Sequence, residues 1–326
     1  MIWKQRGHSI TITSRDKDVT LYLLDRTGFP HINLGRSGTT PLGLVRELPV
    51  RVAKLISVIR RERPAVMTAI AGTFIAPAGR IMKTPSATFY DTEHAGISNA
   101  IAYPLTHHLF LPSCYRKTVK SRHVNYNGYH ELAYLHPDYF TPDPAILGQL
   151  GVREGEKYVI MRFVSWTAGH DIGQRGLSSG MKRTAVEKFS RHAKVFITTE
   201  GDLPTDLASY RIDIPPERMH DALYYATLFY GESATMASEC AVLGTPAIYL
   251  DNVGRGYTDE QERVYDAVFN YTLSPENQEK SITAGIELLQ NDTVKAEWRE
   301  KRNRIIHDKI DVTRFVADTV EEVGRG

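Results

Sequence analysis

The sequence has few cysteines, no long apolar run and no excess of charge of one sign. Cys114 and Cys240 are the only cysteines among 326 residues, and neither belongs to a CxxC pair. We therefore expect no disulfide framework and no cysteine-based zinc site, and a reducing cytoplasm fits the chain. A run of about 18 apolar residues, the length that spans a membrane, is absent, and we expect no signal peptide.

The charge balance and the missing motifs exclude further classes of protein. Lys and Arg number 40 and Asp and Glu 38, which gives a formal net charge of +2. A protein that coats nucleic acid needs a concentrated basic face, so no nucleic-acid partner is expected. The sequence contains neither a GxGxxG fingerprint nor a Walker P-loop, so no motif supports NAD or ATP as a ligand.

Short apolar segments alternate with amphipathic segments along the chain. The alternation predicts strands at 8–13, 31–34, 65–70, 87–90, 108–111, 157–163, 195–198, 227–230 and 247–250. It predicts helices at 14–24, 41–61, 145–150, 181–192, 216–226 and 235–243, and a mostly helical C-terminal part. Such alternation is typical of right-handed βαβ units and of parallel sheets covered on both faces.

A stretch rich in Tyr, His and Pro, 126–144, interrupts the alternation. We therefore expect an α/β protein with two Rossmann-like domains, 1–144 and 145–305, whose parallel sheets face each other across a cleft. A C-terminal helix over 306–326 is placed against the first domain. Aromatic and imidazole side chains within 128–137 suit contacts to a base or a carbohydrate, and a packed hinge explains them equally well.

The strongest candidate site is the strand, turn and helix at 230–246. Its turn consists of small residues, which are Gly231, Ser233, Ala234 and Thr235. Free N–H groups at a helix N-terminus bind phosphate, and small residues let a phosphate approach. Glu239, about one and a half turns into the helix, could accept two hydrogen bonds from a ribose diol. A capped helix with Glu239 in solvent explains the same spacing equally well.

Two loops that follow strands carry further candidates. Arg162 ends a strand, and the loop after it contains Ser165 and His170. Arg and His at this position can bind a diphosphate or assist a leaving group, whereas a His that only bonds to the backbone is the plainer interpretation.

The other loop follows the strand at 87–90 and contains Asp91, Glu93 and His94. Neighbouring charges shift pKa values, so this cluster could hold a general base. Asp91 or Thr92 could instead cap a helix whose first turn contains Glu93.

These residues carry a resemblance to known proteins. The second half resembles the donor-binding domain of GT-B glycosyltransferases and of UDP-N-acetylglucosamine 2-epimerase at 214–216, Met219, 231–233, Glu239 and 244–246. Nearly the whole chain resembles the family called domain of unknown function 354. The matching stretches are 15–20, 91–95, 128–137, 162–166, 170–173 and 235–239.

The resemblance implies a glycosyltransferase that binds a UDP-sugar and needs no cofactor or metal. Glu239 would bind the ribose, the Ser233–Thr235 turn the diphosphate, and residues near Met219 the base. His170 would lie beside the diphosphate, and Glu93 or His94, with Asp91, would face the sugar and activate an acceptor hydroxyl. The acceptor is unknown, and envelope or glycan biosynthesis and a monomer or homodimer are expected.

Two other functions remain open. A nucleotide-sugar 2-epimerase would use the same site to abstract a proton from the sugar, and a non-catalytic protein would bind the nucleotide-sugar without turnover. Family members begin with a strand and a turn that carry Gly and His, whereas this sequence starts inside the following helix. We therefore expect that strand to be missing and the chain as given to be poorly active.

The C-terminal helices carry a cluster of cations, Lys295, Arg299, Lys301, Arg302 and Arg304. A solvated helix face explains this cluster better than peripheral contact with an anionic membrane.

Overall fold

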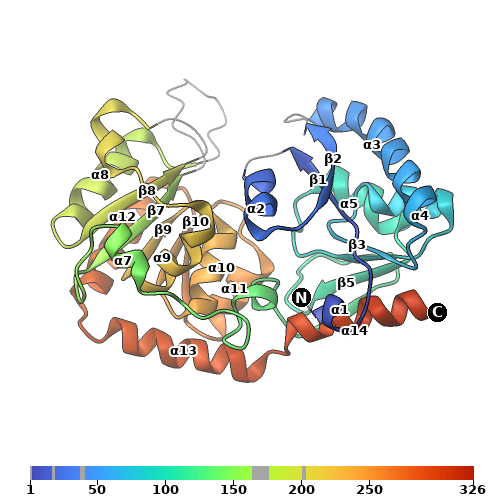
Figure 1. Cartoon of the computed structure of the whole chain (residues 1–326). Coiled ribbons are helices and arrows are strands. Elements are labelled where there is room, and N and C mark those ends of the chain that lie inside the picture. The colour runs from blue at the N-terminus through green and yellow to red at the C-terminus, as the bar shows by residue number, and fades with distance from the viewer. Residues whose placement is uncertain (1, 17–18, 37–40, 164–175, 200–202) are drawn as a thin grey trace. The chain divides into compact units, whose positions relative to one another are not determined.

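The structure, a computed structural model, describes residues 2–16, 19–36, 41–163, 176–199 and 203–326 (Figure 1). The chain forms two compact units. The first contains Met1–Gly128 and Asp311–Gly326, and the second contains Tyr129–Ile310. Residues 129–144 therefore group with the second unit, and the end of the chain groups with the first. Each unit contains parallel strands joined by helices, as the alternation in the sequence predicts.

The first unit contains two separate parallel sheets. One pairs β1 (Ile12–Asp16) with β2 (His31–Arg36), and the other has the order β3-β4-β5-β6. Its strands are β3 (Met67–Ile70), β4 (Ser86–Phe89), β5 (His108–Pro112) and β6 (Val124–Tyr126). The helices are α1 (Ile2–Gln5), α2 (Thr20–Thr27), α3 (Pro41–Glu62), α4 (Ile75–Met82), α5 (Gly96–Leu105) and α14 (Val312–Arg325).

Helix α14 ties the end of the chain to the first unit. The Phe315 ring lies 5.0 to 6.3 Å, centroid to centroid, from the rings of Phe89, Phe110 and Tyr126 on three strands of the sheet. Trp3 Nε1 donates a hydrogen bond to the carbonyl oxygen of Ala317 at 3.1 Å. Aromatic burial of this kind is a large stabilising contribution, so the C-terminal helix belongs to the core of this unit.

An apolar groove of about 450 Å³ lies beside the segments that contain β1 and β3. Its walls include Leu55, Ile59, Val66, Met67 and Val320. None of the residues that the sequence singles out for chemistry lines it. This groove therefore does not coincide with the candidate site.

The second unit has one five-stranded parallel sheet in the order β11-β10-β9-β7-β8. The strands are β7 (Tyr158–Phe163), β8 (Lys194–Thr199), β9 (Leu228–Gly231), β10 (Ala247–Leu250) and β11 (Val268–Tyr271). Every residue of β9 and β10 is buried, as expected for central strands covered on both faces.

The helices of the second unit follow the same order along the chain. They are α6 (Leu132–Leu135), α7 (Ala145–Gln149), α8 (Ser179–Ser190), η1 (Thr205–Tyr210), η2 (Pro216–Arg218), α9 (Met219–Tyr225), α10 (Ala234–Leu243), α11 (Gly256–Arg263), α12 (Pro275–Gln290) and α13 (Val294–Asp308).

Some sequence predictions are wrong in detail. The helix predicted from residue 14 begins at Thr20, because β1 continues to Asp16. Apolar periodicity also missed seven of the described elements, α4, α5, β6, α6, η1, α11 and β11. Strands β6 and β11 are only three and four residues long, which is too short to show an apolar period. Helix α11 has a strongly polar sequence and shows no apolar period either.

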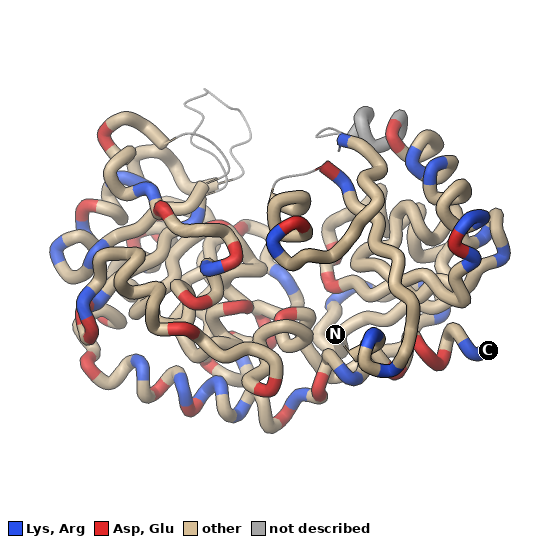
Figure 2. The backbone as a smooth tube through the Cα atoms, viewed as in Figure 1, with Lys and Arg blue, Asp and Glu red and all other residues tan. Residues whose placement is uncertain are grey.

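The prediction that the C-terminal cations form a solvated helix face is also wrong for Lys295 and Arg302. Figure 2 shows basic and acidic residues interspersed along α13. Lys295 is half-buried, and its Nζ donates to the carbonyl oxygens of Tyr224 and Ala226 at 2.7 and 2.8 Å. Arg302 donates to the carbonyl oxygen of Val242 at 3.2 Å. These two side chains satisfy backbone acceptors inside the second unit. Across the described residues, no helix is long and apolar enough to cross a bilayer.

Candidate functional site

The predicted strand, turn and helix are present at the carboxyl end of β9. The strand ends at Gly231, and α10 begins at Ala234 with Ser233 as its N-cap. The Ser233 hydroxyl accepts a hydrogen bond from the backbone N–H of Met236 at 3.3 Å. Thr235 is exposed in the first turn. The open end of this helix therefore presents backbone donors and a positive dipole end, which suit an anion.

Gly231 has a structural role that the sequence did not reveal. It pairs with Arg162 across the β7–β9 ladder, and a Cβ at this position would lie 2.2 Å from the Arg162 carbonyl oxygen. The Arg162 side chain donates to Thr198 Oγ1 at 3.1 Å. Strand packing alone thus requires glycine here, whatever the turn binds.

Glu239 lies in α10 and is 7% exposed, so the interpretation that leaves it in solvent is wrong. Its Oε1 accepts hydrogen bonds from the Tyr134 hydroxyl and from His220 Nε2, both at 2.9 Å. Tyr134 comes from α6 and His220 from α9, directly after Met219. The structure therefore places Glu239 in contact with His220, the residue that follows Met219. No sequence motif marked His220 as a candidate.

A buried ion pair lies next to the same turn. Glu232 Oε2 is 3.4 Å from the Lys182 ammonium, and both side chains are 4% exposed. Lys182 belongs to α8, and burial lowers the pKa of its ammonium. A carboxylate at an anion site is unfavourable by itself, so the lysine offsets its charge. Lys182 has no distinguishing signal in the sequence, because a lysine in a helix is normally exposed.

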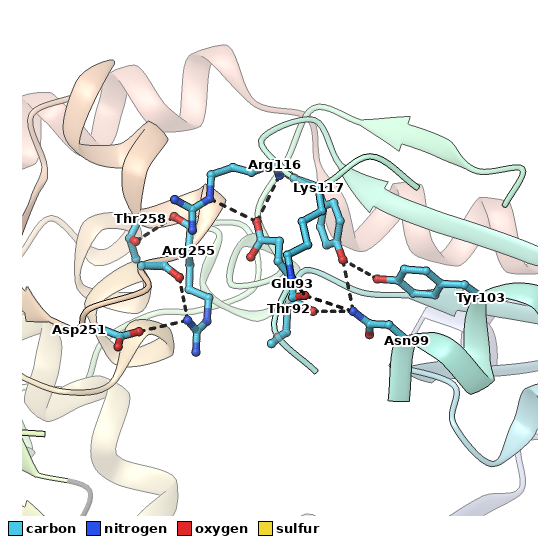
Figure 3. Close-up of polar contacts among 11 residues, drawn as sticks. Thr92, Glu93, Asn99, Tyr103, Arg116, Lys117, Asp251, Arg255 and Thr258 are labelled. Atoms are coloured by element: carbon cyan, nitrogen blue, oxygen red, sulfur yellow. Dashed lines mark hydrogen bonds and ion pairs between the residues drawn. The ribbon is translucent and has the colours of Figure 1, made fainter. Parts of the chain in front are cut away.

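The predicted acidic loop of the first unit lies between β4 and α5. Glu93 is 2% exposed, and its Oε1 accepts a hydrogen bond from the Arg116 backbone N–H at 3.3 Å (Figure 3). The Lys117 ammonium donates to the Glu93 carbonyl oxygen at 2.9 Å. Arg116 Nε also lies 3.9 Å from Glu93 Oε1. A buried carboxylate with one cation beside it therefore stands at the carboxyl end of a parallel strand, the position where open α/β sheets place ligands.

The alternative interpretation of this loop as a helix cap is wrong. Helix α5 begins at Gly96, its N-cap is Ala95, and no side chain caps it. The Thr92 hydroxyl donates to Asp91 Oδ1 at 3.0 Å instead. His94 is half-buried in the turn before the helix. Asp91, Glu93 and His94 therefore stand together in a loop and are not used to terminate a helix.

A second charged pair follows β10 in the other unit. Asp251 Oδ2 accepts a hydrogen bond from the Arg255 guanidinium at 3.2 Å (Figure 3). It also accepts one from the Tyr249 hydroxyl at 2.8 Å. The Thr258 hydroxyl donates to the Arg255 carbonyl oxygen at 3.1 Å. Sequence reasoning missed this pair, although the residues follow a predicted strand at the same sheet edge as the Ser233 turn.

Two predicted site residues, Ser165 and His170, lie outside the described residues. Within the described ranges, no group of three or more His, Cys, Asp or Glu side chains could hold a metal ion. The expected independence from metals and cofactors stays a prediction.

Comparisons with known proteins agree with this architecture. A model of the family described as "Protein of unknown function (DUF354)" matches residues 1–254. No curated protein matches the chain in sequence.

The fold is similar to solved structures of low sequence identity. MurG of Acinetobacter baumannii is 13% identical with a TM-score of 0.59, and the match covers 98% of this chain and 93% of that one. A putative UDP-N-acetylglucosamine 2-epimerase from Listeria monocytogenes is 13% identical with a TM-score of 0.58, over 92% and 82% of the two chains.

A third similar structure is the spinosyn rhamnosyltransferase SpnG complexed with thymidine diphosphate. It is 13% identical with a TM-score of 0.58, over 97% and 93% of the chains. These likenesses confirm the expected GT-B-like fold with two Rossmann-like domains. How the two sheets of this chain face each other stays a prediction.

Proposed function

The chain belongs to the DUF354 family of proteins of unknown function, and we propose that it is a glycosyltransferase that uses a UDP-sugar donor. The observation that carries the proposal is the buried Glu239 carboxylate behind the open, Ser233-capped end of α10. A carboxylate that accepts from a ribose diol and a helix end that binds a diphosphate are the two contacts a nucleoside diphosphate needs.

In this proposal the second unit binds the donor. Backbone N–H groups at Ser233, Ala234 and Thr235 stabilise the diphosphate as negative charge develops on it during departure. Met219 lies beside the base, and His170 assists the leaving group. The buried Lys182 keeps the Glu232 carboxylate paired, so that it does not repel the diphosphate.

The first unit supplies the general base. Glu93 is the best candidate, because it is buried at a strand end with Arg116 and Lys117 next to it. It would take the proton of the acceptor hydroxyl as that oxygen attacks the sugar carbon and the bond to the diphosphate breaks. Asp91 and His94 flank it in the same loop. The reaction needs no metal or other cofactor, takes place in the cytoplasm and contributes to envelope or glycan biosynthesis.

The first experiment measures binding. UDP, UDP-N-acetylglucosamine and ATP are added to the protein, and thermal unfolding is followed. A ligand at 100 times its Kd stabilises by about 2.7 kcal/mol, which raises the Tm by several degrees. We expect UDP and the UDP-sugar to raise the Tm and ATP to leave it unchanged. No rise with any uridine nucleotide overturns the proposal.

A 2-epimerase is the second candidate, favoured by the fold shared with the Listeria protein. The two reactions differ in their products. Incubation of the protein with UDP-N-acetylglucosamine in deuterium oxide gives deuterium at the sugar C2 only if the proton there is abstracted. Transfer gives UDP and a glycoside when an acceptor is present. Binding of UDP with neither product would support a non-catalytic nucleotide-sugar-binding protein.

A further inference from the structure

Two side chains from separate helices of the second unit donate to one carboxylate oxygen of Glu239, which lies on a third helix. The Tyr134 hydroxyl and His220 Nε2 both donate to Glu239 Oε1 at 2.9 Å. Because a carboxylate only accepts, His220 carries a proton on Nε2 in this arrangement. The Tyr134 and His220 rings also contact each other, with centroids 5.4 Å apart, and Phe140 lies edge-on to His220 at 6.2 Å.

The two oxygens of the Glu239 carboxylate differ in the hydrogen bonds that they accept. Oε1 takes both hydrogen bonds that the described residues give to the Glu239 carboxylate. A carboxylate has about four acceptor positions, so Oε2 retains its two. A glutamate side chain has several rotatable bonds, and holding it in one rotamer before a ligand arrives removes an ordering cost from binding.

We propose that Tyr134 and His220 are positioning residues that hold Glu239, so that Oε2 accepts from the two ribose hydroxyls and the site selects ribonucleotide over 2′-deoxyribonucleotide donors. The inference rests on the proposed function, because it assigns the ribose to Glu239. Tyr134 and His220 do not touch the ribose in this scheme. They act through the Glu239 carboxylate. A 2′-deoxy ligand binds less tightly, because it leaves one hydrogen-bond position on Oε2 without a donor.

The test is a cycle of ligand and protein changes measured by calorimetry. UDP and 2′-deoxyuridine diphosphate are titrated into the wild type and into Tyr134→Phe, His220→Ala, His220→Gln and Glu239→Gln. The matched control is Tyr139→Phe, which removes the same atom from a neighbouring exposed tyrosine in the same segment. Thermal unfolding of each variant confirms that it is folded.

The wild type should bind UDP about tenfold more tightly than the deoxy ligand, the size of one hydrogen bond to a charged group. Tyr134→Phe and His220→Ala should each weaken UDP binding about five- to tenfold but change deoxy binding less than twofold. His220→Gln keeps an N–H donor near the Nε2 position and should restore most of the selectivity. Tyr139→Phe should leave both affinities unchanged.

Two results overturn the inference in different ways. Equal weakening of both ligands in Tyr134→Phe and His220→Ala, or no weakening, shows that these residues do not act through a ribose contact, while the proposed function stands if UDP binds. A wild type that binds neither ligand overturns the proposed function itself.

Discussion

Gly231 tests whether the turn at the candidate site is dictated by strand packing or by a ligand. A Cβ added at Gly231 would lie 2.2 Å from the Arg162 carbonyl oxygen and 2.8 Å from the Arg162 nitrogen. Both atoms are backbone of the paired strand β7, so no side chain can rotate away. Relief requires the strands to separate by about 1 Å, because Cβ contacts below 3.0 Å are essentially never found.

That separation would break the local ladder. The Glu232 N–H donates to the Arg162 carbonyl oxygen at 2.9 Å, and an added 1 Å takes this pair beyond hydrogen-bonding distance. Overpacking costs about 1–3 kcal/mol, and an unmade buried hydrogen bond costs about 1–3 kcal/mol. We therefore expect Gly231→Ala to lower the free energy of unfolding of the second unit by about 4 kcal/mol, or about 8–16 °C in Tm.

Urea denaturation and thermal unfolding measure this loss, and Gly180→Ala is the matched control. Gly180 lies in α8 of the same unit, and no heavy atom comes within 4 Å of an added Cβ. Its replacement should be neutral or stabilise by about 0.5 kcal/mol, because alanine loses less backbone entropy in a helix. An unchanged Tm in Gly231→Ala would refute the packing argument. Lost UDP binding at an unchanged Tm would place the requirement for glycine at the ligand.

Three further predictions concern buried charges and the C-terminal helix. Burial lowers the pKa of Lys295 to about 7, so between pH 7 and 9 the unfolded chain binds a proton that the folded chain does not. Stability should therefore rise with pH over this window, by up to about 2.7 kcal/mol at 1.36 kcal/mol per unit, and urea titrations of Lys295→Met should lose that slope. Glu93→Gln should reduce the transfer rate at least 100-fold in a steady-state assay with little change in Tm, because it removes the proposed base and keeps its volume. Retained activity in that variant would exclude Glu93 as the base. Phe315→Ala should destabilise the first unit by about 3 kcal/mol, since its ring packs on Phe89, Phe110 and Tyr126. Hydrogen exchange should show the loss in the first unit, and faster exchange confined to the second unit would contradict this assignment.

Local sequence features were enough to define the class of fold. Apolar runs of four to six residues that alternate with amphipathic segments place the central strands β7, β9 and β10 to within a few residues. The turn of small residues before α10 was also found from local sequence, whereas the role of Ser233 as the N-cap was seen only in the structure. Short elements such as β6 were missed, because three residues are too few to show a period.

Tertiary structure decided what each polar residue does. Glu239 is marked by its helix position, but its partners Tyr134 and His220 lie 105 and 19 residues away in sequence. The pairing of Lys182 with Glu232 is likewise invisible in either segment alone. The sequence by itself determined an α/β chain with a helix end suited to a diphosphate, because backbone periodicity and capping are local. Only the tertiary structure decided which buried charges are paired and which oxygen of Glu239 accepts from Tyr134 and His220, because buried polar groups take their partners from whichever elements the topology brings beside them.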